Sequence, residues 1–345
     1  MLVLTPLPLV IVANAAVGRR WAHLAIGILA GVSAGVTFLI GALDLAGAGR
    51  AAGGPSAQIS VQVDFAYMVT AAISAGLASR PIRERVARFV PIDPDNPVHA
   101  LALVLAVLLF GMSVATTLFT NLASTAPPFT LADEVTQEFA LVVLAAAGVG
   151  IFTRRDLKSA ARRLGLVVPS WWQVVLAIAA GGAFFGFDLA MQALSYAWTP
   201  DSTRQVQTNA QHLFSAFGGP LGIAVIALAP GICEEIMFRG ALQPRLGLLA
   251  TAILFAAIHT QYGVSLIELS VFVLALGLGL LRKLTNTTTS AICHSTYNLL
   301  IAIVGFVGVA TWLAQFAIVL ELVLVAVAAY GIRSVRRRAT QPASP

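Results

Sequence analysis

The chain has 345 residues, of which 58% are hydrophobic and only 10% are charged. Ordinary soluble domains carry roughly 25% charged residues, and apolar runs of about 18 residues or more recur here, so a soluble globular fold is excluded. The net charge of +6 resides in short basic clusters between apolar runs, which indicates membrane topology and no nucleic-acid partner. Two cysteines are too few for a disulfide framework.

Taken in chain order, the apolar segments predict an all-α bundle of about ten transmembrane helices. The predicted spans are 22–47, 60–79, 98–123, 137–152, 172–199, 217–241, 248–261, 264–281, 286–308 and 311–332. The polar segment 200–216 predicts an external loop, and the residues after Arg338 predict a disordered tail.

Basic clusters recur after every second predicted span. They lie at 19–20, 80–88, 154–163, 245, 282–283 and 333–338. The intervening loops hold only Arg50 and Arg204 as basic residues. Because loops rich in lysine and arginine stay in the cytoplasm, the alternation predicts that both termini are cytoplasmic. We therefore expect a multi-pass protein of the cell (plasma) membrane, in contact with membrane lipid.

The segment 233–239, CEEIMFR, places two adjacent acids and an arginine inside a predicted span. An ionisable side chain at bilayer depth costs at least ~2.5–3.5 kcal/mol, so Glu234, Glu235 and Arg239 require a functional explanation. Glu235 and Arg239 are four residues apart and can form an ion pair along one helix face. Glu234 points about 100° away from Glu235, so its side chain is available for another role.

Two further polar positions reach the same depth as Glu234. Pro244 and Gly247 predict the turn between spans 217–241 and 248–261, so that Glu234 and His259 lie at matching positions on an antiparallel hairpin. At 1.5 Å per residue both lie ~14 Å from the cytoplasmic helix ends, and His294 in the later span lies ~16 Å deep. The sequence thus predicts that Glu234, His259 and His294 converge.

His294 and Asn298 are one helical turn apart and share a face. A glutamate, two histidines and an asparagine in a dry site suit hydrolysis, because a carboxylate with an imidazole can deprotonate water and the amide can donate to an oxyanion. The same side chains could instead bind zinc and activate water on the metal. These residue types leave both forms of water activation open.

The three motifs resemble those of a known family. Glu234-Glu235-x-x-x-Arg239, Phe255-x-x-x-His259 and His294-x-x-x-Asn298 are similar, in order and spacing, to the motifs of the CPBP (Abi) family of intramembrane proteases, which includes the type II CAAX prenyl endopeptidases. The resemblance covers about ninety residues, 217–305. It implies an endopeptidase that cleaves a peptide bond near the cytoplasmic leaflet, by metal-free or metallo-endopeptidase chemistry.

The resemblance also implies roles for individual residues. Glu234 and His259 would activate the water, while His294 and Asn298 would stabilise the oxyanion or help to hold a metal. Glu235 and Arg239 would support the site. If zinc is used, its expected ligands are Glu234, His259 and His294. The expected substrate is a peptide or protein that carries a lipid or lacks one.

The same resemblance divides the chain into three predicted parts. Residues 1–200 are transmembrane helices of no recognised motif, residues 201–310 form the protease core, and residues 311–345 are a last helix with a basic cytoplasmic tail. Phe255 more often packs than reacts at such a position, and Cys233 and Cys293 are expected to be small buried hydrophobic residues.

Two other classes of function stay open on the sequence. Asp188 and Glu268 also lie within predicted spans, and a chain of buried acids with Glu234 could serve a proton- or ion-coupled transporter. Transporters often contain an inverted repeat and a pair of broken helices, and the sequence shows neither. The third class is a non-catalytic membrane scaffold, against which the presence of every motif residue argues.

Overall fold

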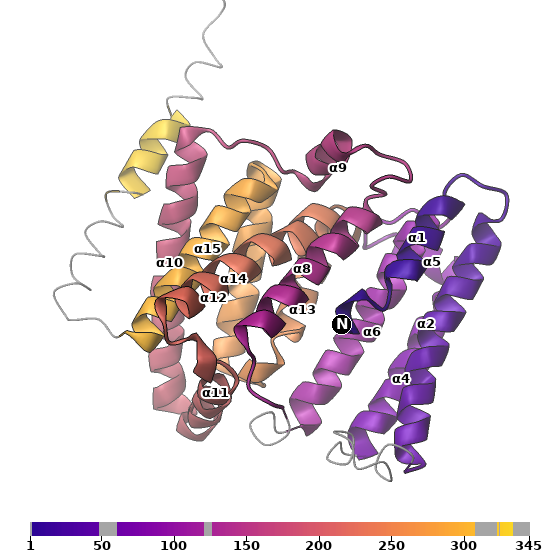
Figure 1. Cartoon of the computed structure of the whole chain (residues 1–345), viewed down its shortest axis with the longest axis horizontal. Helices are drawn as coiled ribbons and strands as arrows, with labels where there is room; N and C mark the ends of the chain where they lie inside the picture. The colour runs from indigo at the N-terminus through magenta and orange to yellow at the C-terminus, as the bar shows by residue number, and fades with distance from the viewer. Residues whose placement is uncertain (1, 48–60, 121–125, 308–322, 324, 334–345) are drawn as a thin grey trace, which may run out of the picture.

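A computed structural model describes residues 2–47, 61–120, 126–307, 323 and 325–333. These residues form a bundle of helices, and none of them belongs to a named β-strand (Figure 1). The predicted all-α architecture is therefore confirmed for the described part of the chain. The predicted span 311–332 and the predicted tail after Arg338 lie mostly or wholly outside the described residues.

The N-terminal helices form one side of the bundle. They are α1 (Leu7–Ala16), α2 (Ala22–Leu45), α4 (Val61–Gly76), α5 (Arg80–Val86) and α6 (Pro97–Phe119). The long helices α2, α4 and α6 pack against one another, as the indigo to purple ribbons in Figure 1 show. Helix α6 begins after Asn96, whose side chain accepts hydrogen bonds from the backbone N–H groups of Val98 and His99, an N-cap that fixes where this apolar helix begins.

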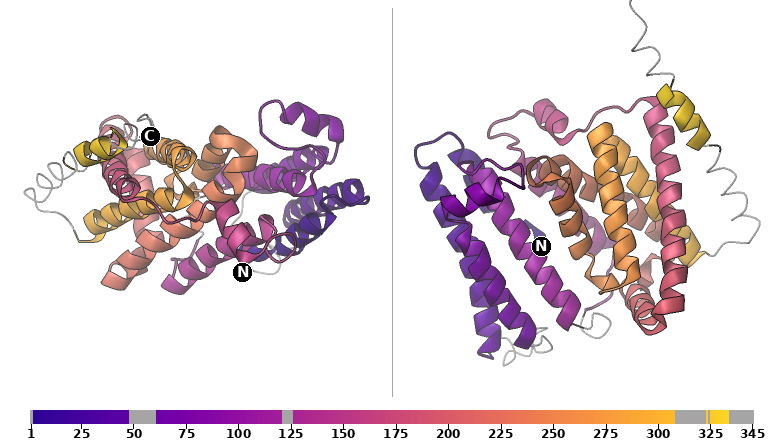
Figure 2. Two further views of the ribbon diagram at one scale, coloured as in Figure 1. Left: turned by 90° about the horizontal axis from the view of Figure 1, so that it is seen from above. Right: turned by 180° about the vertical axis from the view of Figure 1, so that it is seen from behind.

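The remaining helices form the other side and hold the polar motifs. They are α8 (Leu131–Gly148), α9 (Leu157–Leu164), α10 (Trp171–Trp198), α11 (Pro200–Leu213), α12 (Pro220–Glu234), η4 (Glu235–Leu242), α13 (Gln243–Ala257), α14 (Leu266–Leu284) and α15 (Thr287–Phe306). Helix α15 packs between α10 and α12, and α8 packs against α12 and η4. Figure 2 shows α10 and α15 side by side from behind as well.

The turn predicted within the motif region is present. Gly247 adopts φ +82°, a left-handed conformation, inside an otherwise helical segment. Only glycine takes this conformation without strain, because it has no Cβ. The chain therefore reverses near Gly247, which brings the segment containing Phe255 and His259 back alongside η4.

The prediction of ten spans is not confirmed. Each of the first nine predicted segments overlaps a helix, but among the described residues five helices are long and apolar enough to cross a membrane, or six if α4 and α5, bent by 95°, count as one span. Two features account for the difference: α8 and α14 each contain three charged residues, and the continuous helical segment Pro220–Ala257 counts as one candidate span although the chain turns within it at Gly247. The cytoplasmic location of the termini stays a prediction.

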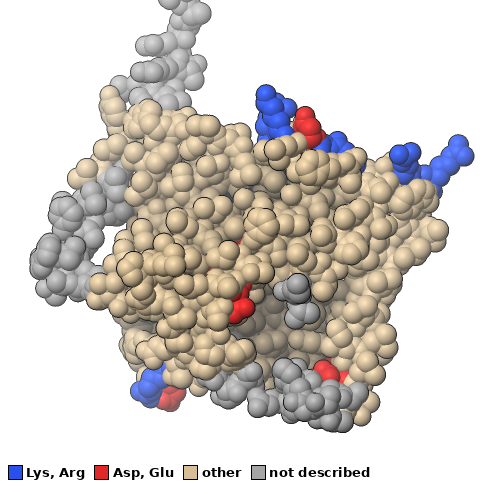
Figure 3. Space-filling view, viewed as in Figure 1, with Lys and Arg blue, Asp and Glu red and all other residues tan. Residues whose placement is uncertain are grey.

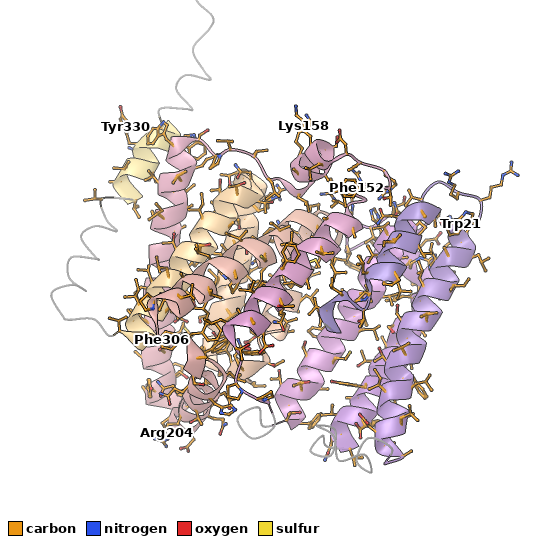
Figure 4. All side chains as sticks on the ribbon, viewed as in Figure 1. Trp21, Phe152, Lys158, Arg204, Phe306 and Tyr330 are labelled. Carbon is orange, nitrogen blue, oxygen red and sulfur yellow. The ribbon has the colours of Figure 1, made fainter. Side chains whose placement is uncertain are left out.

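One end of the bundle is basic. Lysine and arginine side chains gather along the upper edge in Figure 3, and the middle of that face is almost free of them. Figure 4 places Lys158, Trp21 and Tyr330 at this upper end, and Arg204 and Phe306 at the lower end. Charged and aromatic side chains at the rims of an apolar surface are the arrangement expected of a membrane-spanning bundle.

Candidate active site

The two adjacent glutamates lie where α12 changes into the π-helical segment η4. A π-turn holds one more residue than an α-turn and often occurs at functional sites. Three residues earlier, α12 contains Gly231, and a Cβ there would lie 2.3 Å from the Ser295 Oγ. The absence of a side chain thus lets α12 and α15 approach closely, which brings Glu235 next to His294.

Glu235 is fully buried, and its carboxylate is saturated with partners. Its Oε1 lies 3.0 Å from Arg239 NH1 in an ion pair and 3.1 Å from His294 Nδ1. Its Oε2 accepts a hydrogen bond of 2.5 Å from the Ser290 hydroxyl. The ion pair that the four-residue spacing predicts is therefore formed. Glu235 also joins η4 to α15 through two side chains one turn apart.

Glu234 is in a different state from its neighbour. Its side chain is 7% exposed, and its Oε2 is buried without a hydrogen-bond partner among the described residues. Glu138 and Glu134 of α8 are close enough to interact electrostatically with it, as is Arg239. A buried carboxylate oxygen that lacks a donor is costly. Glu234, and not Glu235, therefore keeps an atom available for an external proton donor.

An aromatic cluster brings the two histidines together. The Phe255 ring centroid lies 4.8 Å from that of His259 and 5.8 Å from that of His294. The guanidinium carbon of Arg239 lies 4.2 Å from the Phe255 ring centroid, within cation–π range. Phe255 therefore packs between the two imidazoles, and its placement favours the packing role predicted for it.

Hydrogen bonds fix which nitrogen each histidine can offer. His259 Nδ1 lies 2.7 Å from the carbonyl oxygen of Phe255, which can only accept, so Nδ1 carries the proton and Nε2 of the neutral ring is an acceptor. His294 Nδ1 faces the Glu235 carboxylate, which also leaves Nε2 for other partners. No direct bond links Glu234 to either imidazole among the described residues, so the predicted convergence of Glu234 with the two histidines stays a prediction.

Asn298 is held more loosely than the other motif residues. Its Nδ2 lies 3.5 Å from the carbonyl oxygen of Ile226, at the limit of a hydrogen bond. Pro230, four residues after Ile226, lies inside α12 and has no N–H to bond to that carbonyl. The proline therefore leaves an acceptor toward which the Asn298 amide can turn, one helical turn beyond His294.

The predicted zinc ligands do not form a preassembled site. Within the described ranges, no three histidine, cysteine, aspartate or glutamate side chains are grouped so that they could hold a metal ion. His259 and His294 each have one nitrogen fixed by an oxygen, as metal-binding histidines commonly do, but Glu234 does not join them in one coordination sphere. Zinc therefore stays a prediction from the resemblance.

The other acids of the predicted spans have separate surroundings. Asp188 accepts hydrogen bonds from the Ser270 hydroxyl at 2.5 Å and from Gln192 Nε2 at 2.6 Å, which ties α10 to α14. Glu268 has one buried oxygen without a partner among the described residues. Cys293 is buried and Cys233 is partly buried, and neither forms a disulfide.

Several polar neighbours of the site were not among the predicted residues. Ser290 is one turn before His294, so its hydroxyl could have been found by extending the helix face backwards. Glu134 and Glu138 are both buried and four residues apart, a spacing that is visible in the sequence. Glu138 falls at the start of the predicted span 137–152 and Glu134 just before it, where an acid is easily taken for a solvated one.

A comparison with protein families matches the segment of the chain that contains these residues. Residues 216–300 match the family model described as Rce1-like, type II CAAX prenyl endopeptidase. The matched segment includes η4, the hairpin turn and all three motifs. No curated protein and no solved structure matches the chain. The segment that carries the buried polar site is thus similar to the Rce1-like family of type II CAAX prenyl endopeptidases.

Proposed function

We propose that the protein is an intramembrane endopeptidase that uses Glu234 as the general base in hydrolysis of a peptide bond. The observation that carries this proposal is the contrast between two adjacent glutamates. Glu235 has both oxygens occupied by protein donors, while Glu234 Oε2 is buried and has none among the described residues. A base must keep a lone pair for the proton that it removes.

The proposed step is a direct attack of water on the scissile carbonyl. The carboxylate of Glu234 takes a proton from water while the water oxygen bonds to the carbonyl carbon. His259 helps to orient the water because its Nε2 is an acceptor when Nδ1–H is bonded to Phe255. The carbon–nitrogen bond then breaks, and the proton held by Glu234 passes to the leaving amine.

The oxyanion of the intermediate requires hydrogen-bond donors. The Asn298 amide can supply one, because its single contact with Ile226 at 3.5 Å is weak and is easily exchanged. A protonated His294 would supply another through Nε2–H, with its charge balanced by Glu235 at Nδ1. Arg239 then maintains the orientation of Glu235 and does not contact the substrate.

A second observation bears on the substrate. A surface hollow of about 300 Å³ lies along α12 and is lined by apolar side chains, from Ala224 to Cys233. Its last residue precedes Glu234 in the chain. An apolar hollow on the helix that carries Glu234 suits a lipid-modified peptide better than a freely soluble one. We therefore include a lipidated protein, cleaved near the cytoplasmic leaflet of the plasma membrane, in the proposal.

The test is cleavage of a defined peptide by the purified full-length protein in nanodiscs. A prenylated CAAX peptide and its unprenylated counterpart would be compared on the wild type, on Glu234→Gln, and on Glu84→Gln. We expect Glu234→Gln to lower kcat by at least ~100-fold, while Glu84→Gln, which changes an exposed glutamate, keeps wild-type activity. Hydrolysis retained by Glu234→Gln would exclude the proposed base.

The metal question needs its own measurement on the same samples. Elemental analysis of the wild type and of His259→Ala reports zinc whether or not the substrate is the right one. Zinc in stoichiometric amount that is lost in His259→Ala would favour the metal form of water activation. A wild type that contains no zinc and still hydrolyses the peptide would establish the metal-free form.

A further inference from the structure

Four arginines from distant parts of the chain gather at the basic end of the bundle. Arg163 lies on α9, and the charges of Arg245, Arg155 and Arg282 all act on it. Arg155 follows α8, Arg245 is in the first turns of α13, and Arg282 is near the end of α14. We refer to these four residues as the arginine cluster.

The charges that act on Arg163 are all positive. Burial and the neighbouring positive charges of Arg245, Arg155 and Arg282 lower the pKa of Arg163 to about 10. The pKa of Arg154 is also lowered by burial and by Arg155 and Arg245. Among the described residues, no aspartate or glutamate is among the charges that shift the pKa of Arg154, Arg163, Arg245 or Arg282. Asp156, which follows Arg155 in the chain, accepts a hydrogen bond from the backbone N–H of Ser159. The arginines remain charged at neutral pH and repel one another.

The protein satisfies only part of the hydrogen-bonding capacity of the cluster. Arg163 NH1 donates to the carbonyl oxygen of Gly240 at 3.3 Å, and Arg155 donates to the carbonyl oxygen of Val149. Arg282 Nε is buried without a partner among the described residues. Since each guanidinium has five N–H donors, many donors remain for a ligand with several acceptor oxygens.

Exposed apolar side chains lie next to the cluster in the sequence. Phe152 is 86% exposed, Val168 is 95% exposed and Leu284 is 78% exposed. Phe152 precedes Arg155 by three residues, Val168 follows the end of α9, and Leu284 is the last residue of α14. Figure 4 places Phe152 at the upper end of the bundle, together with Lys158 of α9. Large apolar side chains beside uncompensated cations indicate the boundary between lipid chains and headgroups.

We propose that the arginine cluster binds the phosphate headgroup of an anionic phospholipid. A phosphate offers several oxygens in the geometry that guanidinium groups bind best, and basic pockets between helices at a membrane surface are suited to such headgroups. The exposed apolar side chains favour a lipid over a free phosphate ion, because they would contact the acyl chains.

The position of the cluster connects this ligand to the polar site. A Cβ on Gly240 would lie 2.8 Å from the carbonyl oxygen of Leu164, so α9 packs tightly against η4 one residue after Arg239. The Thr287 hydroxyl also donates to the carbonyl oxygen of Leu164 at 2.6 Å. Helix α9 therefore contacts both η4 and the start of α15, the two elements that position Glu235 and His294. A bound headgroup would stabilise this arrangement.

The proposal is tested by lipid binding, without use of the proteolytic activity. The purified full-length protein would be titrated in phosphatidylcholine nanodiscs with a fluorescent phosphatidylglycerol. We expect Arg163→Gln and Arg245→Gln each to weaken binding about fivefold. Arg162→Gln is the matched control, because it removes the same charge from an exposed neighbour on α9 and is expected to leave binding unchanged.

Two further arms distinguish the source of the phosphate. Inorganic phosphate should fail to displace the labelled lipid, and labelled phosphatidylcholine should show no dependence on Arg163 or Arg245. Equal binding by the wild type and the Arg245→Gln variant would overturn the proposal, as would displacement by inorganic phosphate. Arg245 makes no hydrogen bond or ion pair among the described residues, so this variant remains informative if Arg163→Gln fails to fold.

Discussion

Glu234 and Glu235 are adjacent, yet the partners of their two carboxylates differ. Glu235 is a structural anion whose partners come from two elements, Arg239 in η4 and Ser290 and His294 in α15. Glu234 has a buried oxygen without such partners. If Glu234 is the base that we propose, substitutions at the two positions should separate stability from activity.

We predict that Glu235→Gln destabilises the protein by about 3–5 kcal/mol, because it leaves the buried Arg239 without its partner. The measurement is the unfolding free energy in detergent, with Glu234→Gln as the matched variant. The latter should be as stable as the wild type or more so, since it removes a buried charge and breaks no bond seen in the structure. Equal destabilisation by both variants would contradict this division.

Some contacts of Glu235 can be predicted from the sequence and others cannot. The pairing of Glu235 with Arg239 follows from their spacing of four residues, because side chains four residues apart lie on the same face of a helix. The bonds from Ser290 and His294 to Glu235 span 55 and 59 residues, and no local rule gives them. The depth of His294 in the bundle predicted that it lies near Glu234, but its hydrogen bond is to Glu235. Depth alone does not show which face of one helix points toward another helix.

At the scale of elements, the site depends on how closely α12 and α15 approach. A Cβ on Gly231 would lie 2.8 Å from the backbone nitrogen and Cα of Ser295, next to His294. Close packing through small residues is a usual feature of helices in membranes. A shift of α15 away from α12 would move His294 relative to Glu235 and Asn298 relative to Ile226.

We predict that Gly231→Ala costs about 1–3 kcal/mol of stability and lowers kcat as well, because α15 must move. Gly186→Ala in α10 is the matched control. A Cβ there meets nothing within 4 Å, and alanine favours a helix over glycine by up to ~1 kcal/mol. Melting temperature and peptide cleavage should fall together in Gly231→Ala only. A wild-type kcat in that variant would show that the approach of α15 is unimportant.

The sequence predicted helices in nearly the right places but not the π-helical segment η4. Periodicity arguments assume 3.6 residues per turn, and a π-turn departs from this without a signature in residue type. The turn at Gly247 could be predicted because Pro244 and Gly247 lie at the boundary between two apolar runs, where proline and glycine typically mark a turn. The conformation of a glycine can be predicted from its neighbours in the sequence, whereas η4 lies against α8 and α15, which are distant in the chain.

At the scale of the whole molecule, the charges and the apolar surface indicate how the bundle sits in a membrane. Lys158, with Trp21 and Tyr330, marks one end, and Arg204 and Phe306 mark the other (Figure 4). Apolar side chains such as Leu24, Phe65 and Leu228 are exposed along the helices between these ends. The arginine cluster also belongs to the first end. The positive-inside rule therefore predicts that this end faces the cytoplasm.

This orientation can be measured in intact cells. We predict that Gln207→Cys on α11 reacts with a membrane-impermeant maleimide, whereas Lys158→Cys on α9 reacts only after the membrane is permeabilised. The unmodified chain reports the background from Cys233, because Cys293 is buried. The reverse pattern would place the arginine cluster outside the cell and contradict the rule.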